Sequence, residues 1–398
     1  MTDRFIYFDN AATTRPTREV CDAVLAAMRE RYGNPSSLHG KGREAERLVD
    51  ESREMVARAM GVDPQGVIFT SGGTEANNMA FAGYLRRGPR GRANRVLTTE
   101  TEHPSILGPC DEARNAGWEV GFLSVDGDGI INLNELESKI DDRVSMIALT
   151  HVNSETGAIQ PIKDIGSLCG KLCPNAHLHL DCVQSFGKLP LSPRGYGADI
   201  AGVGVGISVS VSAHKIHGTK GAGAIYFSAP ARVLPVLYGG GQERGLRSGT
   251  ENTPAIAGFG IAARDAASGL ESYAARVAGL KRHMLDSLDK AGVGYIRISS
   301  ETLSSPYILA TSFPGIRAET MVNYLSGRGV YISAGSACSS RRADKTGSRA
   351  LAAMGVKPTI IESAVRFSFS RFNTNSEVES AVDTIKAALT ELRGKCKK

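Results

Sequence analysis

Hydrophobic positions follow two alternating spacings through the first two-thirds of the chain. Helical spacing appears in TREVCDAVLAAMRERYG, where Val20, Val24 and Met28 fall on one face, and in GREAERLVDESREMVARAMG, which closes at Gly61. Short runs rich in β-branched residues come next, separated by helix-like segments, at 66–70, 95–99, 118–125, 144–152 and 177–181. Strands that alternate with helices predict right-handed crossovers and a mostly parallel sheet covered on both faces.

The pattern changes near residue 254. An alanine-rich helical stretch occupies 254–295, and the extended runs GYIRIS, PYILATSF, GVYISA and AVRFSFS follow, with helices between them and one at the end. This pattern of one long helix followed by alternating strands and helices predicts a smaller α+β domain. We therefore expect a large domain over residues 14–258 and a small domain formed by residues 1–13 and 259–398.

Composition narrows the classes of protein to consider. With 398 residues, 41% hydrophobic and 22% charged, the chain has the profile of an ordinary globular protein. The formal net charge of +6 is spread along the chain without a basic stripe, so we expect no direct nucleic-acid partner. No window holds the roughly 18 apolar residues of a membrane span, and the N-terminus lacks the apolar stretch of a signal peptide.

The cysteines favour a cytoplasmic setting. Seven of them, an odd number with irregular spacing, argue against a disulfide framework. Cys169, Cys173, His177, His179 and Cys182 are close enough in sequence to consider a zinc site. HLHLD alternates like a strand, however, and the spacing fits no standard zinc module. We interpret these residues as packing residues and expect no metal.

Polar residues directly follow the predicted strands, which is where open parallel sheets bind ligands. SGGTEANN comes after the run at 66–70. Its glycines permit a close backbone approach, and Thr74 starts a helix whose free N–H groups and dipole favour an anion. An ordinary turn with a helix cap is the alternative. The segment is not a nucleotide-binding phosphate loop, because no Gly-Lys-Ser/Thr follows.

Four further polar side chains stand at strand ends. His103 and Asn153 each come just past a strand, Asp181 is the last residue of HLHLD, and Gln184 lies three residues on. A carboxylate at a strand end in an apolar setting needs a cationic partner, and a protonated ring nitrogen would suit it. Taken singly, each of these residues is equally consistent with a solvated or capping role.

Lys215 is the residue that relates the polar groups at the strand ends to one type of reaction. It follows the buried-looking run SVSVS, with Ser212 before it and His214 beside it. A surface position is usual for lysine, but desolvation lowers the pKa of an amine and makes it nucleophilic, as Schiff-base chemistry requires. An anion site, a carboxylate, a flat histidine and this lysine together predict pyridoxal 5'-phosphate as cofactor. GVGVG at 202–206 lacks the spacing of a dinucleotide fingerprint.

The predicted small domain adds a thiol and an arginine. Cys338 lies among glycine, serine and alanine residues in a mobile-looking loop, where Arg341 and Arg342 would favour the thiolate. Arg366 stands inside an apolar alternating strand, which suits either a fork on a substrate carboxylate or a structural ion pair. A cofactor lysine and a nucleophilic thiol together predict removal of sulfur from an amino acid, with alanine released and a persulfide left on Cys338.

Ordered motifs run along almost the whole chain: YFDNAATT, GNPSS, FTSGGTEANN, TEH, HVNSETG, LDCVQSFGKLP, SAHKIHGTKG, GGGQERGLRSGTEN, GSACSS and VRFSFSRF. In these motifs the chain resembles the cysteine desulfurases of the nitrogen-fixation and iron–sulfur-assembly type, within the class V aminotransferase group. The resemblance implies pyridoxal-phosphate fold type I, as in aspartate aminotransferase, with a seven-stranded, mostly parallel sheet between helices. It also implies a homodimer, L-cysteine as substrate, and a sulfur-acceptor protein such as an iron–sulfur scaffold.

The resemblance further implies a role for each site residue. Those that hold the phosphate are Gly73, Thr74, Ser212, His214 and, from the other subunit, Thr250. Those around the ring are Asp181 at its nitrogen, Gln184 at its phenolic oxygen, Asn153, and His103, which stacks on the ring and assists proton transfer. Those that bind the substrate are Asn34, Asn153 and Arg366. The catalytic residues are Lys215, Cys338 and His103.

The chain departs from the family pattern in several places. AGVGVGIS at 201–208 is inserted before the lysine motif, where it either lengthens a strand or forms a bulge. Ser154, Thr156 and His217 replace residues that are more usual in the family. The chain also ends soon after its last helix, without the tail that some members use to dock a scaffold.

The sequence also leads to expectations about the sulfur acceptor and about alternative functions. The basic residues of the Cys338 loop predict an acidic acceptor surface; they are Arg341, Arg342, Lys345 and Arg349. A selenocysteine lyase or a related class V aminotransferase is the alternative activity. A binding module that kept the fold without catalysis is a third, motivated only by the inserted glycine stretch.

Overall fold

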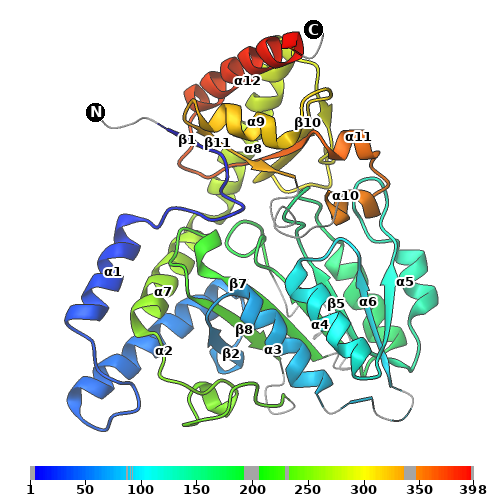
Figure 1. The fold of residues 1–398 in the computed structure, drawn as a ribbon. Coiled ribbons are helices and arrows are strands. Elements are labelled where there is room, and N and C mark those ends of the chain that lie inside the picture. The colour runs from blue at the N-terminus through cyan, green and yellow to red at the C-terminus, as the bar shows by residue number, and fades with distance from the viewer. Residues whose placement is uncertain are drawn as a thin grey trace.

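The structure is a computed structural model that describes residues 5–86, 88–89, 91, 93–191, 206–228, 233–335 and 347–395. Figure 1 shows a large layered body built around one sheet, with a smaller helix-covered part above it that also carries the first strand and the last helix of the chain. None of the helices in these ranges is long and apolar enough to cross a membrane.

A seven-stranded sheet forms the centre of the large body. Its strands, in spatial order, are β2 (Val67–Thr70), β8 (Gly223–Phe227), β7 (Gly206–Ser212), β6 (His177–Asp181), β5 (Val144–Thr150), β3 (Arg95–Thr99) and β4 (Glu119–Leu123). Only β8 runs antiparallel to its neighbours. This confirms the predicted fold class, and each of the five predicted β-rich runs contains one of these strands.

Alternate residues along the strands explain why both faces of the sheet are covered. Val67, Leu97 and Ile147 belong to one core with helices α2 (Gly40–Met60), α6 (Ile162–Leu172) and α7 (Thr253–Ser268). Their neighbours Ile68, Val96 and Met146 belong to a second core with α3 (Gly73–Leu85) and α4 (Pro104–Asn115). Because successive strand residues point to opposite faces, strands buried on both sides carry apolar residues toward both cores. The short helix α5 (Leu133–Lys139) packs beside α6.

The smaller part holds a four-stranded antiparallel sheet. Its spatial order is β12 (Ser333–Ala334), β13 (Ala364–Ser368), β10 (Ile308–Ser312) and β9 (Ile296–Arg297). A separate core packs this sheet against α8 (Leu270–Lys290), α9 (Ala318–Ser326) and α12 (Asn375–Lys395). Two short helices, α10 (Arg349–Ala353) and α11 (Pro358–Ile361), precede β13.

The start of the chain reaches this smaller part. Strand β1 (Ile6–Tyr7) pairs in parallel with β11 (Val330–Tyr331), and Phe8 and Ala11 lie in the smaller part's core. Helix α7 packs in the large core as far as Ala266. The predicted domain boundary at residue 258 therefore falls inside α7, and the division itself stays a prediction.

Three local expectations can be compared with the structure. Helix α1 (Arg18–Arg29) buries Val20 and Ala27. Met28 is also expected on the buried face, but it is 61% exposed, because α1 packs mainly against α7. Helix α2 ends at Gly61 as expected, with φ 68° in the left-handed region that glycine favours. Of the inserted stretch, Gly206–Ser208 pairs in continuous register with β6 and so lengthens β7, while residues 201–205 lie outside the described ranges.

Candidate active site

A cavity of about 480 Å³ opens at the carboxyl ends of the parallel strands. Segments that follow β2, β3, β5, β6 and β7 line it, together with residues 9–12 and parts of the smaller sheet. The predicted site residues that line it are Gly73, Thr74, His103, Asn153, Asp181, Gln184, Ser212, His214, Lys215 and Arg366. The fold thus brings together ten of the residues that the sequence singled out.

Lys215 sits where β7 ends. Its strand is buried along its length, and a short 3-10 turn over Ala213–Lys215 carries the lysine to the edge of the cavity. The Lys215 Nζ atom donates to the carbonyl oxygens of Ala11 at 2.6 Å and Ala12 at 2.8 Å. Two carbonyls from the start of the chain therefore hold the amine at the cavity wall.

Asp181 is the last residue of β6 and is buried. Its Oδ1 accepts from the backbone N–H of Val183 at 2.9 Å, and its Oδ2 accepts from Asn77 Nδ2 at 2.8 Å. Each carboxylate oxygen keeps a lone pair for a further donor. A protonated ring nitrogen is a donor of the required kind.

His103 caps the start of α4 and faces the same cavity. Its Nδ1 accepts from the backbone N–H of Ser105 at 3.1 Å and lies 2.7 Å from Ser105 Oγ. Burial lowers the pKa of His103; the charge of Asp181 opposes this shift and that of Lys215 adds to it. The imidazole is thus held neutral with one ring nitrogen fixed against α4.

The other end of the cavity is suited to a phosphate. Helix α3 begins at Gly73, and no side chain caps its first turn, so its N–H groups remain for an anion. Ser212 Oγ is buried and has no hydrogen-bond partner among the described residues. A Cβ on Gly73 would lie 2.5 Å from Val183 Cγ2, so only glycine fits this approach. An orphaned hydroxyl beside an uncapped helix start fits the phosphate of pyridoxal phosphate.

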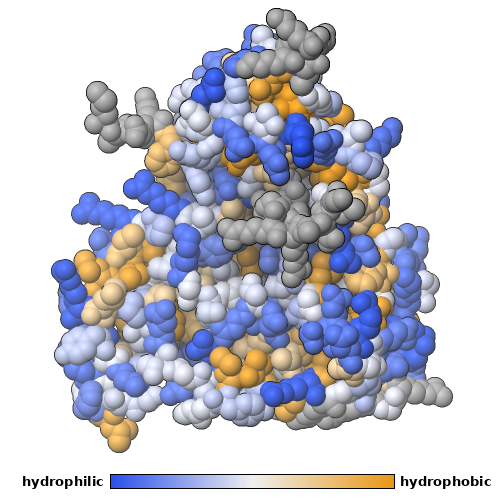
Figure 2. All heavy atoms as spheres, viewed as in Figure 1, coloured by the Kyte–Doolittle hydropathy of each residue, from blue (hydrophilic) through white to orange (hydrophobic). Residues whose placement is uncertain are grey.

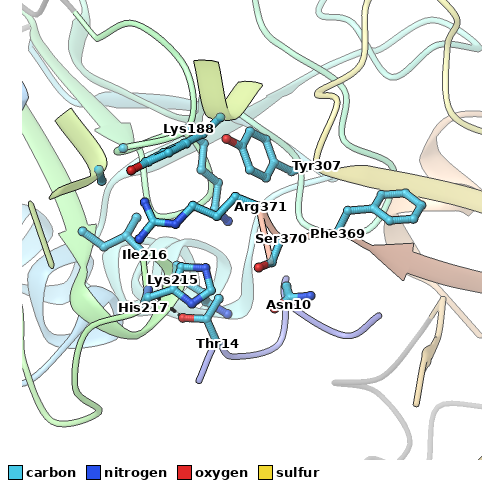
Figure 3. A pocket seen from close by; sticks show the side chains of 13 residues that line it. Asn10, Thr14, Lys188, Lys215, Ile216, His217, Tyr307, Phe369, Ser370 and Arg371 are labelled. Carbon is cyan, nitrogen blue, oxygen red and sulfur yellow. Dashed lines mark hydrogen bonds between the residues drawn. The ribbon is translucent and has the colours of Figure 1, made fainter. Parts of the chain in front are cut away.

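Gln184 and Lys188 form a pair behind the cavity. Lys188 Nζ donates to Gln184 Oε1 at 3.2 Å, and Gln184 Nε2 donates to the Ala11 carbonyl at 2.9 Å. Burial, with the nearby charges of Lys215 and Arg366, lowers the pKa of Lys188 to about 7. Figure 3 shows Lys188 and Lys215 around the same small cavity of about 30 Å³. This pairing orients the Gln184 amide with its nitrogen away from Lys188.

Arg366 and Asn153 lie on the side of the cavity nearest the smaller sheet. Arg366 Nη2 pairs with Asp9 Oδ1 at 2.8 Å, and Nη1 donates to the Ser154 carbonyl at 2.9 Å. The ion pair that the sequence left as an alternative is therefore present, while Arg366 Nε has no partner among the described residues. Asn153 Oδ1 accepts from two backbone N–H groups, those of Glu155 and Thr156, and thereby shapes this wall.

Two predicted residues, Asn34 and Thr250, are not brought to this cavity. Asn34 lies in the turn after α1, where its Oδ1 accepts from the backbone N–H of Ser36, and Thr250 lies exposed in the segment before α7. Neither lines the cavity. Cys338 falls outside the described ranges with Arg341, Arg342 and Lys345, whereas Arg349 begins α10 and pairs with Glu100 at 3.4 Å.

The structure also identifies residues that the sequence did not single out for the site. Asn77 contacts Asp181, Asp9 pairs with Arg366, and Lys188 contacts Gln184. Glu102 is buried next to His103, accepts from the backbone N–H of Thr150 at 2.7 Å, and has its pKa raised to about 7 by burial. The sequence signals that could have identified two of these residues were the position of Lys188, four residues after Gln184, and that of Glu102, directly before His103.

The cysteine and histidine group on α6 and β6 forms no metal centre in the part of the chain described here. No three of the described histidine, cysteine, aspartate or glutamate residues are arranged to hold an ion. His177 Nε2 and His179 Nδ1 instead contact Ser208 Oγ, at 2.7 and 2.8 Å. These two histidines belong to a buried hydrogen-bond network.

Comparison with known proteins gives a consistent result. The profile of the family described as Aminotransferase class-V matches residues 6–380. The chain is 36% identical over 397 residues to the cysteine desulfurase IscS of Rickettsia peacockii, covering 98% of this chain and 92% of that protein. A solved structure of a NifS-like protein superposes with a TM-score of 0.89 at 35% identity, covering 98% and 100% of the two chains. Another, described as SspA in complex with cysteine, gives 0.78 at 28% identity, covering 93% and 100%.

Proposed function

The chain belongs to the class V aminotransferase family and is one of its cysteine desulfurases, and we propose that it uses pyridoxal phosphate to convert L-cysteine into L-alanine. The observation that carries this proposal is the meeting of Lys215, Asp181, His103 and the uncapped start of α3 around one cavity. The relatives are named cysteine desulfurases, so the selenocysteine lyase or aminotransferase alternative is not favoured.

The described residues suit each part of the cofactor. The N–H groups at Gly73 and Thr74 would hold the phosphate with Ser212 and His214, Asp181 would meet the ring nitrogen, and Lys215 would bind the aldehyde carbon. Gln184 would donate to the phenolic oxygen. When bound, pyridoxal phosphate supplies an electron-accepting ring that stabilises negative charge developing on the amino acid.

The protein's own groups bind the substrate and move its protons. Arg366, held by Asp9 and Ser154, would orient the carboxylate of cysteine, with Asn153 and Asn34 completing the site. His103, neutral and fixed against Ser105, would stack on the ring and exchange protons near the substrate. The thiol of Cys338, which lies outside the described residues, would take the sulfur as a persulfide and pass it to an acceptor such as an iron–sulfur scaffold.

A homodimer is part of this proposal. Thr250 lies away from the cavity of its own chain and would reach the phosphate of the other subunit. Apolar side chains stand exposed on α1 and after it, namely Leu25, Met28, Tyr32 and Leu38. Figure 2 shows hydrophobic atoms at the surface on the side of the molecule where α1 lies in Figure 1. A second copy of the chain would cover these side chains.

The decisive experiment combines spectroscopy with product analysis. Purified protein supplied with pyridoxal phosphate should turn yellow, and cysteine with a thiol reductant should yield equal amounts of alanine and sulfide. Borohydride reduction followed by mass spectrometry should place the cofactor on Lys215. The Cys338→Ser variant should keep the colour and lose sulfide production. A cofactor attached to another lysine, or normal turnover by Cys338→Ser, would contradict the proposal.

A further inference from the structure

A buried hydrogen-bond network lies between β6, β7 and α3, directly behind the candidate site. Strand positions two apart share a face, and the pairing register places His179 beside Ser208 and Asp181 beside Ser210. All four of these side chains are buried, and hydrogen bonds connect them to Asn77 on α3. We refer to Asn77, Ser105, His179, Ser208 and Ser210 as the Asn77 network.

Asn77 has every hydrogen-bonding capacity of its amide used. Its Nδ2 donates to Asp181 Oδ2 and to Ser105 Oγ, both at 2.8 Å. Its Oδ1 accepts from His179 Nε2 at 3.0 Å and from Ser210 Oγ. An amide has two N–H donors and two oxygen lone pairs, so these four contacts fix which way it faces. Rotating it would set its oxygen against the Asp181 carboxylate.

The direction of each proton follows from this arrangement. Asn77 Oδ1 can only accept, so His179 carries its proton on Nε2 and its Nδ1 is an acceptor. Ser208 Oγ, 2.8 Å away, then donates to that Nδ1 and accepts from His177 Nε2 at 2.7 Å. Both histidines are neutral, because burial lowers their pKa values, that of His179 to about 3.

The same reasoning reaches His103 from the other side of Asn77. Because the backbone N–H of Ser105 makes His103 Nδ1 an acceptor, Ser105 Oγ, which accepts from Asn77, gives its own proton to that nitrogen, 2.7 Å away. Two donors at Nδ1 leave no room for a proton there, so a neutral His103 carries its proton on Nε2.

We propose that Asn77 is a positioning residue that fixes the Asp181 carboxylate and the His103 tautomer together, with Ser210 and His179 holding its amide in place. The Asn77 side chain thereby orients both the His103 Nε2 proton, which would face the cofactor ring, and the Asp181 carboxylate, which would meet the ring nitrogen. Strand β7, which includes the end of the inserted stretch, supplies Ser208 and Ser210 for this task. The inference rests on the proposed use of pyridoxal phosphate.

The first test uses the cofactor-free chain. Protein carrying 15N-labelled histidine should show, by long-range proton–nitrogen NMR, His103 and His179 as neutral rings protonated on Nε2. In Asn77→Ala the His179 Nε2 proton loses its acceptor and Ser105 loses the group that directs its hydroxyl, so the signals of both rings should shift. Asn78→Ala, the exposed neighbour on the same helix, should leave them unchanged. A wild-type His103 protonated on Nδ1 would overturn the proposal.

The second test measures the cofactor. Asn77→Ala should raise the Kd for pyridoxal phosphate by about 10-fold, since Asp181 loses one of its two donors, and should alter the absorption band of the bound cofactor. Asn77→Asp, nearly the same shape, keeps the proposal testable if the alanine variant fails to fold, because its carboxylate cannot donate to Asp181. Wild-type affinity and spectrum in both folded variants would refute the positioning role. A wild-type protein that binds no pyridoxal phosphate would instead refute the proposed function.

Discussion

Replacing Glu243 by alanine tests how the segment that carries Thr250 is held to the large sheet. The Glu243 carboxylate meets Arg53 of α2 through two contacts, Nη1–Oε2 and Nη2–Oε1, each 2.8 Å long. Its Oε2 also accepts from the backbone N–H of Phe69, in β2, at 2.7 Å. The side chains of Arg53 and Glu243 are 10% and 2% exposed, so water has little access to replace a lost partner.

The expected loss follows from what the substitution leaves behind. Arg53 would keep its contact with the Val67 carbonyl at 2.9 Å but would remain charged and buried. Removing one partner of a buried ion pair costs about 3–5 kcal/mol. The orphaned N–H of Phe69 contributes within that total, because contacts sharing one carboxylate are not additive. We expect Glu243→Ala to lower the free energy of unfolding by about 4 kcal/mol.

Urea unfolding of the cofactor-free chain, followed by circular dichroism, measures this loss. The exposed pair between Glu100 and Arg349 provides a control, and Glu100→Ala should cost at most about 1 kcal/mol. The double variant Arg53→Met/Glu243→Leu removes both charges and should recover most of the loss. If Glu243→Ala costs no more than Glu100→Ala, the argument from burial is wrong.

Three further predictions concern buried polar groups. Ser212→Ala should stabilise the cofactor-free chain by about 1 kcal/mol, because it removes a buried hydroxyl that has no hydrogen-bond partner among the described residues. The same variant should weaken pyridoxal phosphate binding about tenfold. A less stable cofactor-free variant would contradict this prediction. Folding lowers the pKa of Lys188 from 10.5 to about 7, so between these pH values the unfolded chain binds more protons than the folded chain. The free energy of unfolding should therefore rise with pH in this range. Lys188→Met should reduce that rise and leave the part due to Lys281, whose pKa is also lowered to about 7. The pKa of Glu102 rises from 4.5 to about 7, so this group contributes a fall in stability as pH increases across that window, against the rise contributed by buried histidines whose pKa values are lowered. Urea titrations at several pH values should show that Glu102→Gln removes the falling contribution.

Strand patterns allowed the large sheet to be predicted because its strands are buried on both faces. RVLTT and HLHLD match β3 and β6 at both ends, and the polar residues that follow the strands meet at one edge. The carboxyl ends of parallel strands must lie together, so position along each strand was enough to gather Asp181, His103 and Lys215. No contact between distant segments had to be known.

Contacts between distant segments account for what the sequence left out. Asn77 looks like an ordinary helix residue until β6 and β7 place Asp181, His179 and Ser210 around it. The exposure of Met28 likewise depends on how little of α1 is covered by α7. Helical periodicity identifies a face that can be buried, but only the neighbouring elements decide how much of it is.

The start of the chain determines where the Lys215 amine points. Ala11 offers one carbonyl to both Lys215 Nζ and Gln184 Nε2, at 2.6 and 2.9 Å. The same residue donates its backbone N–H to Ser368 Oγ of β13, and Asp9 pairs with Arg366 of that strand. One short segment thus connects the amine that would bind the cofactor to the arginine that would bind the substrate. A shift of the smaller sheet relative to the larger one would have to move both groups, which makes this segment the physical link between Lys215 and Arg366.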